Sequence, residues 1–454
     1  MDLKGKKILI VGTGISGIGA ATLLYKAGAC PILFDENDTV SIEDIRKKLA
    51  EGVHCDIITK TLPDEVLAEL ALVVLSPGVP TDTPFVERFR DAGITIWGEV
   101  ELGYAFSKGK VVAITGTNGK TTTTALTGKI MQDYYQSVFV VGNIGNPYTL
   151  EALDTVDDTV TVAEISSFQL ETTEYFKPVV SAILNITPDH LNRHHTMENY
   201  VAVKESITKN QTKAEFCVLN YEDEYTRAFG QERCPAFVIF FSSKRKLEHG
   251  YYLEDEDIWY AEDGKAIRLM NIHEMKLLGT HNVENVMAAI AMTAAFGVPM
   301  ESILQSVRAF RAVEHRIEYV ATKKGVDYYN DSKGTNPDAA IKGIQAMNKP
   351  TILIGGGYDK QSEYYEWIEA FDSKVKWLVL LGQTKEKIAA CARAHGFTNI
   401  LMADSLEEVM KLCEEKAEPG DAVLLSPACA SWGMFPNYEV RGNMFKDLVN
   451  QIEE

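Results

Sequence analysis

The sequence has little of what membrane, secreted or nucleic-acid-binding proteins require. No segment approaches the roughly 18 consecutive apolar residues of a membrane span, so we expect no membrane insertion. The seven cysteines form no Cys-x-x-Cys pair and leave one over, so we expect reduced, mostly buried thiols in a cytoplasmic protein. Basic residues number 45 against 64 acidic ones, and the net charge of −19 argues against a nucleic-acid-binding face.

The chain also has no repeat and no low-complexity linker, and its 454 residues predict two or three domains. Apolar strands run into glycine-marked turns at residues 7–11, 111–115 and 351–354, and strands alternate with helical patterns. This alternation predicts an α/β protein with parallel sheets and ligand sites at the carboxyl ends of the strands. We expect three domains: a Rossmann-like domain at 1–98, a phosphate-loop domain at 99–312 and a second Rossmann-like domain at 313–454.

The first segment superficially resembles a lipoprotein signal peptide. Lys6 and Lys7 precede an apolar run that ends in Ala27-Gly28-Ala29-Cys30. Four glycines between residues 12 and 19 interrupt that run at strand–turn–helix spacing. We therefore interpret it as the first structural unit of the mature protein.

The loop Gly116-Thr117-Asn118-Gly119-Lys120-Thr121-Thr122 follows an apolar strand and opens a helix. Glycines allow backbone N–H groups to face phosphate oxygens, and the helix dipole favours anions there. Lys120 is suited to neutralise the outer phosphates of ATP, and the Thr121 hydroxyl is suited to bind Mg²⁺. The usual pattern has a further glycine where this chain has Ile114, so the loop is a shorter variant. The alternative is a plain strand–helix turn.

The turn Gly12-Thr13-Gly14-Ile15-Ser16-Gly17, with Asp35 at the end of the next strand, fits the dinucleotide-binding fingerprint. A dehydrogenase would use this turn for NAD. A protein that already has an ATP loop would use the same geometry for a second phosphate-bearing ligand. A purely structural glycine turn is the third interpretation.

Glu164 and His190 each follow a strand of the central segment, and we expect both at the rim where the phosphate loop lies. A carboxylate and an imidazole there are candidate Mg²⁺ ligands, although Mg²⁺ prefers oxygen. A structural histidine is the alternative.

Several motifs along the chain resemble those of the Mur ligases. They lie at residues 115–122, 142–145, 164–171, 279–285 and 314–316. Within that family, residues 330–336 and 426–431 are most similar to the branch that adds D-glutamate. Sister ligases carry other residues in place of Asp331-Ser332-Lys333. The motifs extend from Gly12 to Arg441, so the resemblance covers nearly the whole chain.

The resemblance implies that the first domain binds the uridine diphosphate part of a substrate, with no hydride chemistry. The implied contacts are Gly14, Ile15, Ser16, Asp35, Ser76, Gly78 and, from the central domain, Asn143. Family members often have threonine beside the equivalent of Asp35, whereas this chain has Glu36.

The resemblance also implies an ATP site that draws on two domains. Its residues are 116–122 together with Asn282, Asn285, Arg316 and Asp331. The implied metal ligands, for two Mg²⁺ ions, are Thr121, Glu164, His190 and Lys204. Lys204 matches a lysine that is carbamylated in the family, and carbamylation converts an ammonium into an oxygen ligand. From the residues alone, Lys204 reads as an ordinary surface lysine on a helix.

For the amino-acid substrate, the resemblance implies a pocket of cations and hydroxyls in the third domain. D-glutamate carries two carboxylates and one ammonium, and such groups would bind it. The implied residues are Lys333, Thr335, Lys360 and Ser431, with Tyr438 as an aromatic wall.

The implied activity is an ATP-dependent amide ligase that adds D-glutamate to UDP-N-acetylmuramoyl-L-alanine through an acyl phosphate. Lys120, His190 and Lys204 are the implied catalytic residues. Such a monomeric enzyme would serve cytoplasmic peptidoglycan precursor synthesis, and through it cell-wall biogenesis, cell shape and cell division. A sister ligase for another amino acid, an NAD-dependent dehydrogenase and a nucleotide-gated binding protein remain alternatives.

Overall fold

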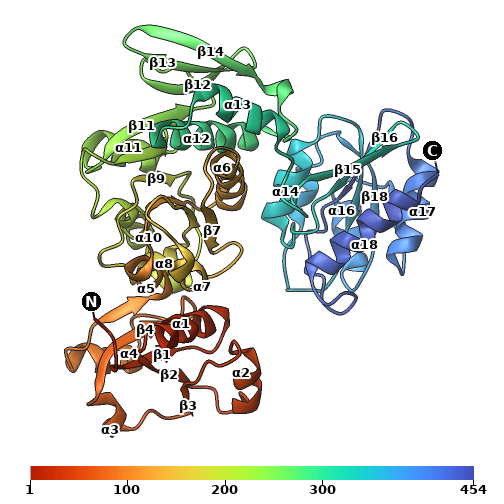
Figure 1. The fold of residues 1–454 in the computed structure, drawn as a ribbon. Helices are drawn as coiled ribbons and strands as arrows, with labels where there is room; N and C mark the ends of the chain where they lie inside the picture. The colour runs from red at the N-terminus through yellow and green to blue at the C-terminus, as the bar shows by residue number, and fades with distance from the viewer. Residues whose placement is uncertain (1, 454) are drawn as a thin grey trace. The chain divides into compact units, whose positions relative to one another are not determined.

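The computed structural model describes residues 2–453 (Figure 1). Contacts within the chain divide it into two compact units. The first contains the residues up to Glu274 together with Glu284–Arg308, and the second contains Met275–Val283 and the residues from Ala309 onward. Two sheets lie in the first unit and one in the second. Among the described residues, no helix is both long enough and apolar enough to cross a membrane.

The first sheet is parallel throughout and has the strand order β3-β2-β1-β4-β5. Its elements are β1 (Lys7–Val11), α1 (Ile15–Lys26), β2 (Cys30–Asp35), α2 (Ile42–Lys48), β3 (Asp56–Thr59), α3 (Asp64–Leu67), β4 (Leu70–Leu75), α4 (Pro84–Asp91) and β5 (Ile96–Gly98). Successive β1 side chains point to opposite faces, so Ile8 and Ile10 pack on one side while Leu9 and Val11 pack on the other. The strand and helix at residues 7–26 confirm that this segment is structural.

The second sheet has nine strands in the order β14-β13-β12-β11-β10-β9-β6-β8-β7. Its strands are β6 (Lys110–Thr115), β7 (Val138–Gly142), β8 (Val160–Glu164), β9 (Val180–Ile183), β10 (Phe216–Asn220), β11 (Phe237–Ser242), β12 (Gly250–Glu254), β13 (Asp257–Glu262) and β14 (Lys265–Asn271). The α-helices of this part of the chain are α5 (Glu99–Phe106), α6 (Lys120–Tyr134), α7 (Tyr148–Glu151), α8 (Ser167–Leu170), α9 (Leu191–His194), α10 (Met197–Glu205), α11 (Glu224–Glu232), α12 (Thr280–Phe296) and α13 (Met300–Ala309).

The third sheet lies in the second unit and has the order β15-β16-β20-β17-β18-β19. Its elements are β15 (Glu318–Lys323), β16 (Val326–Asn330), α14 (Pro337–Ala346), β17 (Thr351–Gly355), α15 (Tyr365–Glu369), β18 (Val375–Leu380), α16 (Lys385–Ala394), β19 (Ile400–Met402), α17 (Leu406–Lys416), β20 (Ala422–Leu425) and α18 (Tyr438–Gln451). Helices α14, α15 and α16 pack on one face, and α17 and α18 pack on the other.

The predicted parallel pairing is confirmed for most strands, but the outer edges of the second and third sheets are antiparallel. Strands β12, β13 and β14 pair antiparallel, as do β15 and β16. Two-residue turns with positive φ connect them, for example Asp263-Gly264 and Lys324-Gly325. Such turns match the twist of a hairpin and let neighbouring strands reverse without a crossover helix. The three-part α/β fold itself is confirmed, whereas the domain limits near 98 and 312 stay predictions.

Candidate active site

The glycine-rich loop between β6 and α6 has the backbone geometry of an anion site. Gly116 has φ +149° and Gly119, at the helix N-cap, has φ +85°. Nζ of Lys120 curls back over the loop and donates to the carbonyl oxygens of Gly116 at 2.9 Å and Thr117 at 2.8 Å. The lysine is therefore held against the loop, at the positive end of a 15-residue helix.

Lys204 lies under the same loop and is only 1% exposed. Its Nζ donates to the Gly116 carbonyl oxygen at 2.8 Å and lies 4.7 Å from the centre of the Tyr200 ring. Burial, together with the positive charge of Lys120, lowers the pKa of Lys204 to about 7. The interpretation of Lys204 as a surface lysine is wrong, because the face of α10 that carries Lys204 packs against the loop.

Glu164 ends β8, next to the strand that carries the loop, and is 1% exposed. Its Oε1 accepts a hydrogen bond from Nδ2 of Asn143 at 2.7 Å, whereas Oε2 is buried and has no partner among the described residues. A buried carboxylate oxygen without a donor is costly unless a ligand completes it. Glu164 therefore fits the role of a cation ligand at this edge.

His190 follows β9, on the other side of β6, and takes a left-handed conformation with φ +51°. Its side chain is 49% exposed, its Nε2 lies 3.4 Å from Oδ2 of Asp189, and its ring lies 4.8 Å from that of Phe168. Glu164 and His190 thus lie at the same edge of the sheet. Among residues 2–453, no three His, Cys, Asp or Glu side chains gather as a metal-binding group.

The fingerprint turn of the first sheet lies where β1, β2 and β4 end side by side. Gly12 has φ +102°, and a side chain there would overlap Oγ of Ser76, so the turn and the Ser76 loop approach closely. The Thr13 hydroxyl donates to Oδ2 of Asp35 at 2.6 Å, and Ile15 is 68% exposed above the turn. Gly14 opens α1. Gly14, Ile15, Asp35 and Ser76 are therefore brought together, while Asn143 belongs to the Glu164 edge.

The third sheet brings together loops that follow three adjacent strands, β16, β20 and β17. Backbone hydrogen bonds link them: Asp331 N–H donates to Leu425 O at 2.7 Å, and Tyr358 N–H donates to Ala430 O at 2.9 Å. These loops carry the residues expected to bind the amino acid, together with the start of α18: Lys333, Thr335, Lys360, Ser431 and Tyr438.

A buried polar network holds the Asp331 loop. Asp331 Oδ2 accepts from the Ser426 hydroxyl at 2.6 Å, and burial raises the pKa of Asp331 to about 7. Arg441, 1% exposed, donates to the Ser332 hydroxyl at 3.0 Å, to Ser332 O at 2.8 Å and to Cys429 O at 3.2 Å. The guanidinium therefore ties α18 to both loops.

The ATP residues predicted outside the loop divide between the two units. Asn285 lies beside the loop: its Oδ1 accepts from the Thr123 hydroxyl at 3.2 Å. In the second unit, Asn282 donates to Leu278 O at 2.7 Å, and Arg316 and Asp331 lie with the third sheet.

Sequence reasoning missed Arg193. Its guanidinium lies 4.9 Å from the Phe168 ring and donates to both carboxylate oxygens of Glu171, and to Val79 O at 2.9 Å. It therefore links the loop after β4 to the end of α8 in the central part of the first unit. Glu171 belongs to a motif seen in the sequence, but nothing near Arg193 marked it as the partner.

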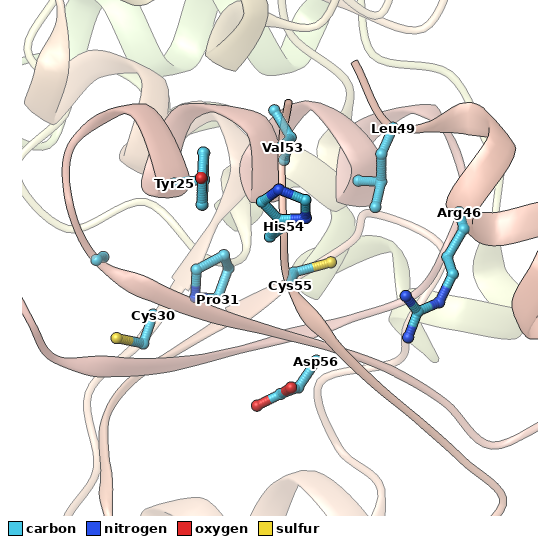
Figure 2. Close-up of a pocket in the computed structure, with 10 residues that line it drawn as sticks. Tyr25, Cys30, Pro31, Arg46, Leu49, Val53, His54, Cys55 and Asp56 are labelled. Atoms are coloured by element: carbon cyan, nitrogen blue, oxygen red, sulfur yellow. The ribbon is translucent and has the colours of Figure 1, made fainter. Parts of the chain in front are cut away.

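A separate recess of about 500 Å³ lies at the opposite edge of the first sheet. Figure 2 shows Cys30, Arg46, His54 and Asp56 around it. Cys30 and Asp56 begin their strands, whereas the fingerprint turn follows the end of β1. None of the predicted site residues lines this recess.

Known proteins match the chain over its whole length. It is 59% identical over 452 residues to a UDP-N-acetylmuramoylalanine–D-glutamate ligase of Lachnospira eligens, covering 100% of both chains. A protein of the same name from Clostridioides difficile is 47% identical over 455 residues, again covering 100% of both. The chain belongs to the Mur ligase family.

Three Mur ligase domain models match in succession. They are the Mur ligase MurD-like N-terminal domain at residues 6–98, the Mur ligase middle domain at 114–293 and the Mur ligase glutamate ligase domain at 315–429. The predicted resemblance to the Mur ligases is therefore confirmed.

Solved Mur ligases share the fold at low sequence identity. The UDP-N-acetylmuramate–alanine ligase MurC of Thermotoga maritima has a TM-score of 0.61 at 20% identity, covering 98% of this chain and 100% of its own. MurF from the same organism has a TM-score of 0.57 at 18% identity, covering 99% and 96%. These similarities support the three-domain α/β architecture.

Proposed function

We propose that this Mur ligase adds D-glutamate to UDP-N-acetylmuramoyl-L-alanine at the expense of ATP. The observation that carries the proposal is the full-length identity of 59% to a relative named for that reaction. Two features, each within its own unit, support the proposal chemically: the loop with its buried lysine in the first unit, and the cationic loops of the third sheet in the second.

In the proposed reaction, an oxygen of the alanine carboxylate attacks the γ-phosphorus of ATP. The bond from that phosphorus to the bridging oxygen breaks, ADP leaves, and an acyl phosphate is formed. This step needs neutralisation of phosphate charge more than covalent assistance from the protein. Lys120 is already held over the loop by hydrogen bonds to two carbonyl oxygens. With ATP bound, phosphate oxygens would accept these hydrogen bonds instead of the carbonyl oxygens. The loop N–H groups would bind the remaining phosphate oxygens.

We propose Mg²⁺ as the cation of this site, held by Thr121, Glu164 and His190. The unpartnered Oε2 of Glu164 fits an oxygen-seeking cation at the rim. When bound, Mg²⁺ supplies positive charge to the phosphate oxygens.

We further propose that Lys204 is carbamylated. Only a neutral amine reacts with CO₂, and the pKa of about 7 leaves a large neutral fraction at neutral pH, unlike that of an exposed lysine. The carbamate would supply oxygen ligands in place of an ammonium for a second cation.

We also propose sites for the other two substrates. The turn at 12–17 with Asp35 and Ser76 would bind the uridine diphosphate group, because close glycine backbone and a helix N-terminus favour phosphates. Lys333, Thr335, Lys360 and Ser431 would bind D-glutamate, whose amine attacks the acyl phosphate and expels phosphate. A cytoplasmic location, a monomeric state and a role in cell division stay predictions.

The deciding assay measures ADP release from ATP with UDP-N-acetylmuramoyl-L-alanine and each of several amino acids. We expect release that depends on D-glutamate. Release with another amino acid alone would identify a sister ligase, and ATP binding without release would indicate a non-catalytic nucleotide-binding protein.

A further inference from the structure

The two lysines of the amino-acid loops share one arrangement. Nζ of Lys333 lies 3.8 Å from the centre of the Tyr438 ring, and Nζ of Lys360 lies 4.9 Å from that of Trp432. An ammonium is attracted to the negative face of an aromatic ring, most strongly to tryptophan. Tyr438 was expected as a wall of the site, whereas no function had been assigned to Trp432.

The backbone brings Trp432 and Lys360 together from two different loops. The loop after β17 carries Tyr358 and Lys360, the loop after β20 carries Trp432, and an antiparallel bridge joins Tyr358 to Ala430. The Tyr358 and Trp432 rings then meet edge to face, with centres 5.7 Å apart. Tyr358 therefore supports the ring on which the Lys360 ammonium rests.

Burial does not explain these two aromatic residues. Trp432 is 54% exposed and Tyr358 is 41% exposed, on loops next to Ser431. Large aromatic side chains contribute to stability mainly when they are buried. The contact between Trp432 and Lys360 is therefore exposed, and burial of the indole does not account for it.

The charged residues around Lys360 also leave its ammonium available to a ligand. The neighbouring carboxylate, Asp359, faces Lys387 at 3.6 Å, and within residues 2–453 no carboxylate pairs with Lys360. A carboxylate partner would neutralise the ammonium, whereas an aromatic ring orients it and leaves its charge available. Ordering the long side chain in advance also lowers the entropy cost of binding a ligand.

We propose that Trp432 is a positioning residue that holds Lys360 ready for a carboxylate of the incoming amino acid, with Tyr358 supporting the indole. This inference rests on the proposed function, because it assumes that a dianionic amino acid binds these loops. It assigns Trp432 an effect on amino-acid affinity and no part in phosphoryl transfer.

The test compares Trp432→Leu with Trp432→Phe, which keeps an aromatic face. We expect Trp432→Leu to raise KM for D-glutamate about two- to fivefold, as expected for an exposed cation–ring contact. The kcat and the KM for ATP should not change, and Trp432→Phe should recover most of the loss. Trp377→Leu is a matched control, because Lys416 lies 4.9 Å from the Trp377 ring elsewhere in this unit.

A double-substitution cycle with Lys360→Gln separates positioning from simple structural support. Measured as kcat/KM for D-glutamate, Trp432→Leu should have almost no further effect once Lys360 is replaced. Additive effects, or an unchanged KM in Trp432→Leu, would overturn the inference while leaving the proposed function intact. Absence of D-glutamate-dependent ADP release by the unsubstituted protein would overturn both.

Discussion

The proposed ATP loop of the first unit and the proposed amino-acid loops of the second unit are built in different ways. In the ATP loop, backbone groups supply the geometry: two glycines with positive φ, and carbonyl oxygens that hold the ammonium groups of Lys120 and Lys204. In the amino-acid loops, side chains supply it, since Lys333 and Lys360 rest on aromatic rings. The loop itself consists of consecutive residues, to which α10 adds Lys204. The amino-acid loops bring together only residues that are far apart in the chain.

This difference predicts different responses to substitution. A backbone-built site should lose most of its function when one loop residue changes, because its groups have a fixed geometry. A site built from separate side chains should lose affinity in smaller steps, because each contact contributes about 0.5–1 kcal/mol.

The largest expected effect is that of Lys120→Ala. We expect kcat to fall about 10³-fold, because the charge that neutralises the outer phosphates is lost at the reacting centre. Binding of the uridine diphosphate substrate, measured by calorimetry without ATP, should change little, because that site lies at the first sheet. Turnover near the level of the unsubstituted protein would contradict the role of the loop.

Lys204→Ala should lower kcat about 10²-fold, the size seen when a ligand or its support is removed. Acetate or formate should restore part of the activity by supplying the missing carboxylate. Lys204→Arg, which keeps a positive charge but cannot be carbamylated, should be inactive and should not respond to either acid. Failure of every short carboxylate to restore activity would argue against the carbamate.

The pH dependence of the unsubstituted protein tests the same residue. The pKa of Lys204 is lowered to about 7, so the ammonium predominates below that pH and the reactive amine above it. Activity should therefore fall as pH decreases through about 7. Bicarbonate added at pH 6.5, which is about half a unit below that pKa, should restore part of it. An activity profile that is flat from about pH 6 to 8 would contradict the proposal.

The same contrast explains what the sequence revealed. The strand, the glycines and the helix around Lys120 are consecutive, so local pattern alone predicted the loop and its place at the strand ends. Burial of Lys204 depends on how α10 packs beneath that loop, which no local pattern encodes. Trp432 gave no signal at all, because its partner Lys360 lies on another loop, 72 residues away by number.

The antiparallel hairpins were not predicted, for a different reason. Asp263-Gly264 is a typical hairpin turn and was visible in the sequence. The alternation of strands and helices along most of the chain outweighed it, so the antiparallel edge of the second sheet was not predicted. Local turn chemistry was the better guide there.

A pair of glycine substitutions compares the two regions directly. Gly119 and Gly433 both have φ +85°, so alanine should cost each about 1–2 kcal/mol of backbone strain. A side chain at Gly119 would also overlap Oδ1 of Asn285, whereas at Gly433 the nearest atom is 4.0 Å away. We expect Gly119→Ala to raise KM for ATP at least about tenfold, the equivalent of about 1.4 kcal/mol. Gly433→Ala should leave every KM nearly unchanged, and equal effects would contradict the contrast.

The smallest expected effect concerns Tyr438, whose ring lies beneath Lys333. Tyr438→Leu should raise KM for D-glutamate about two- to fivefold, because the ammonium loses the ring face that orients it. Tyr438→Phe should leave that KM nearly unchanged, since the ring and not the hydroxyl makes the contact. If Tyr438→Phe instead matched Tyr438→Leu, the hydroxyl would be the binding group, and the two lysines would not share one mode of positioning.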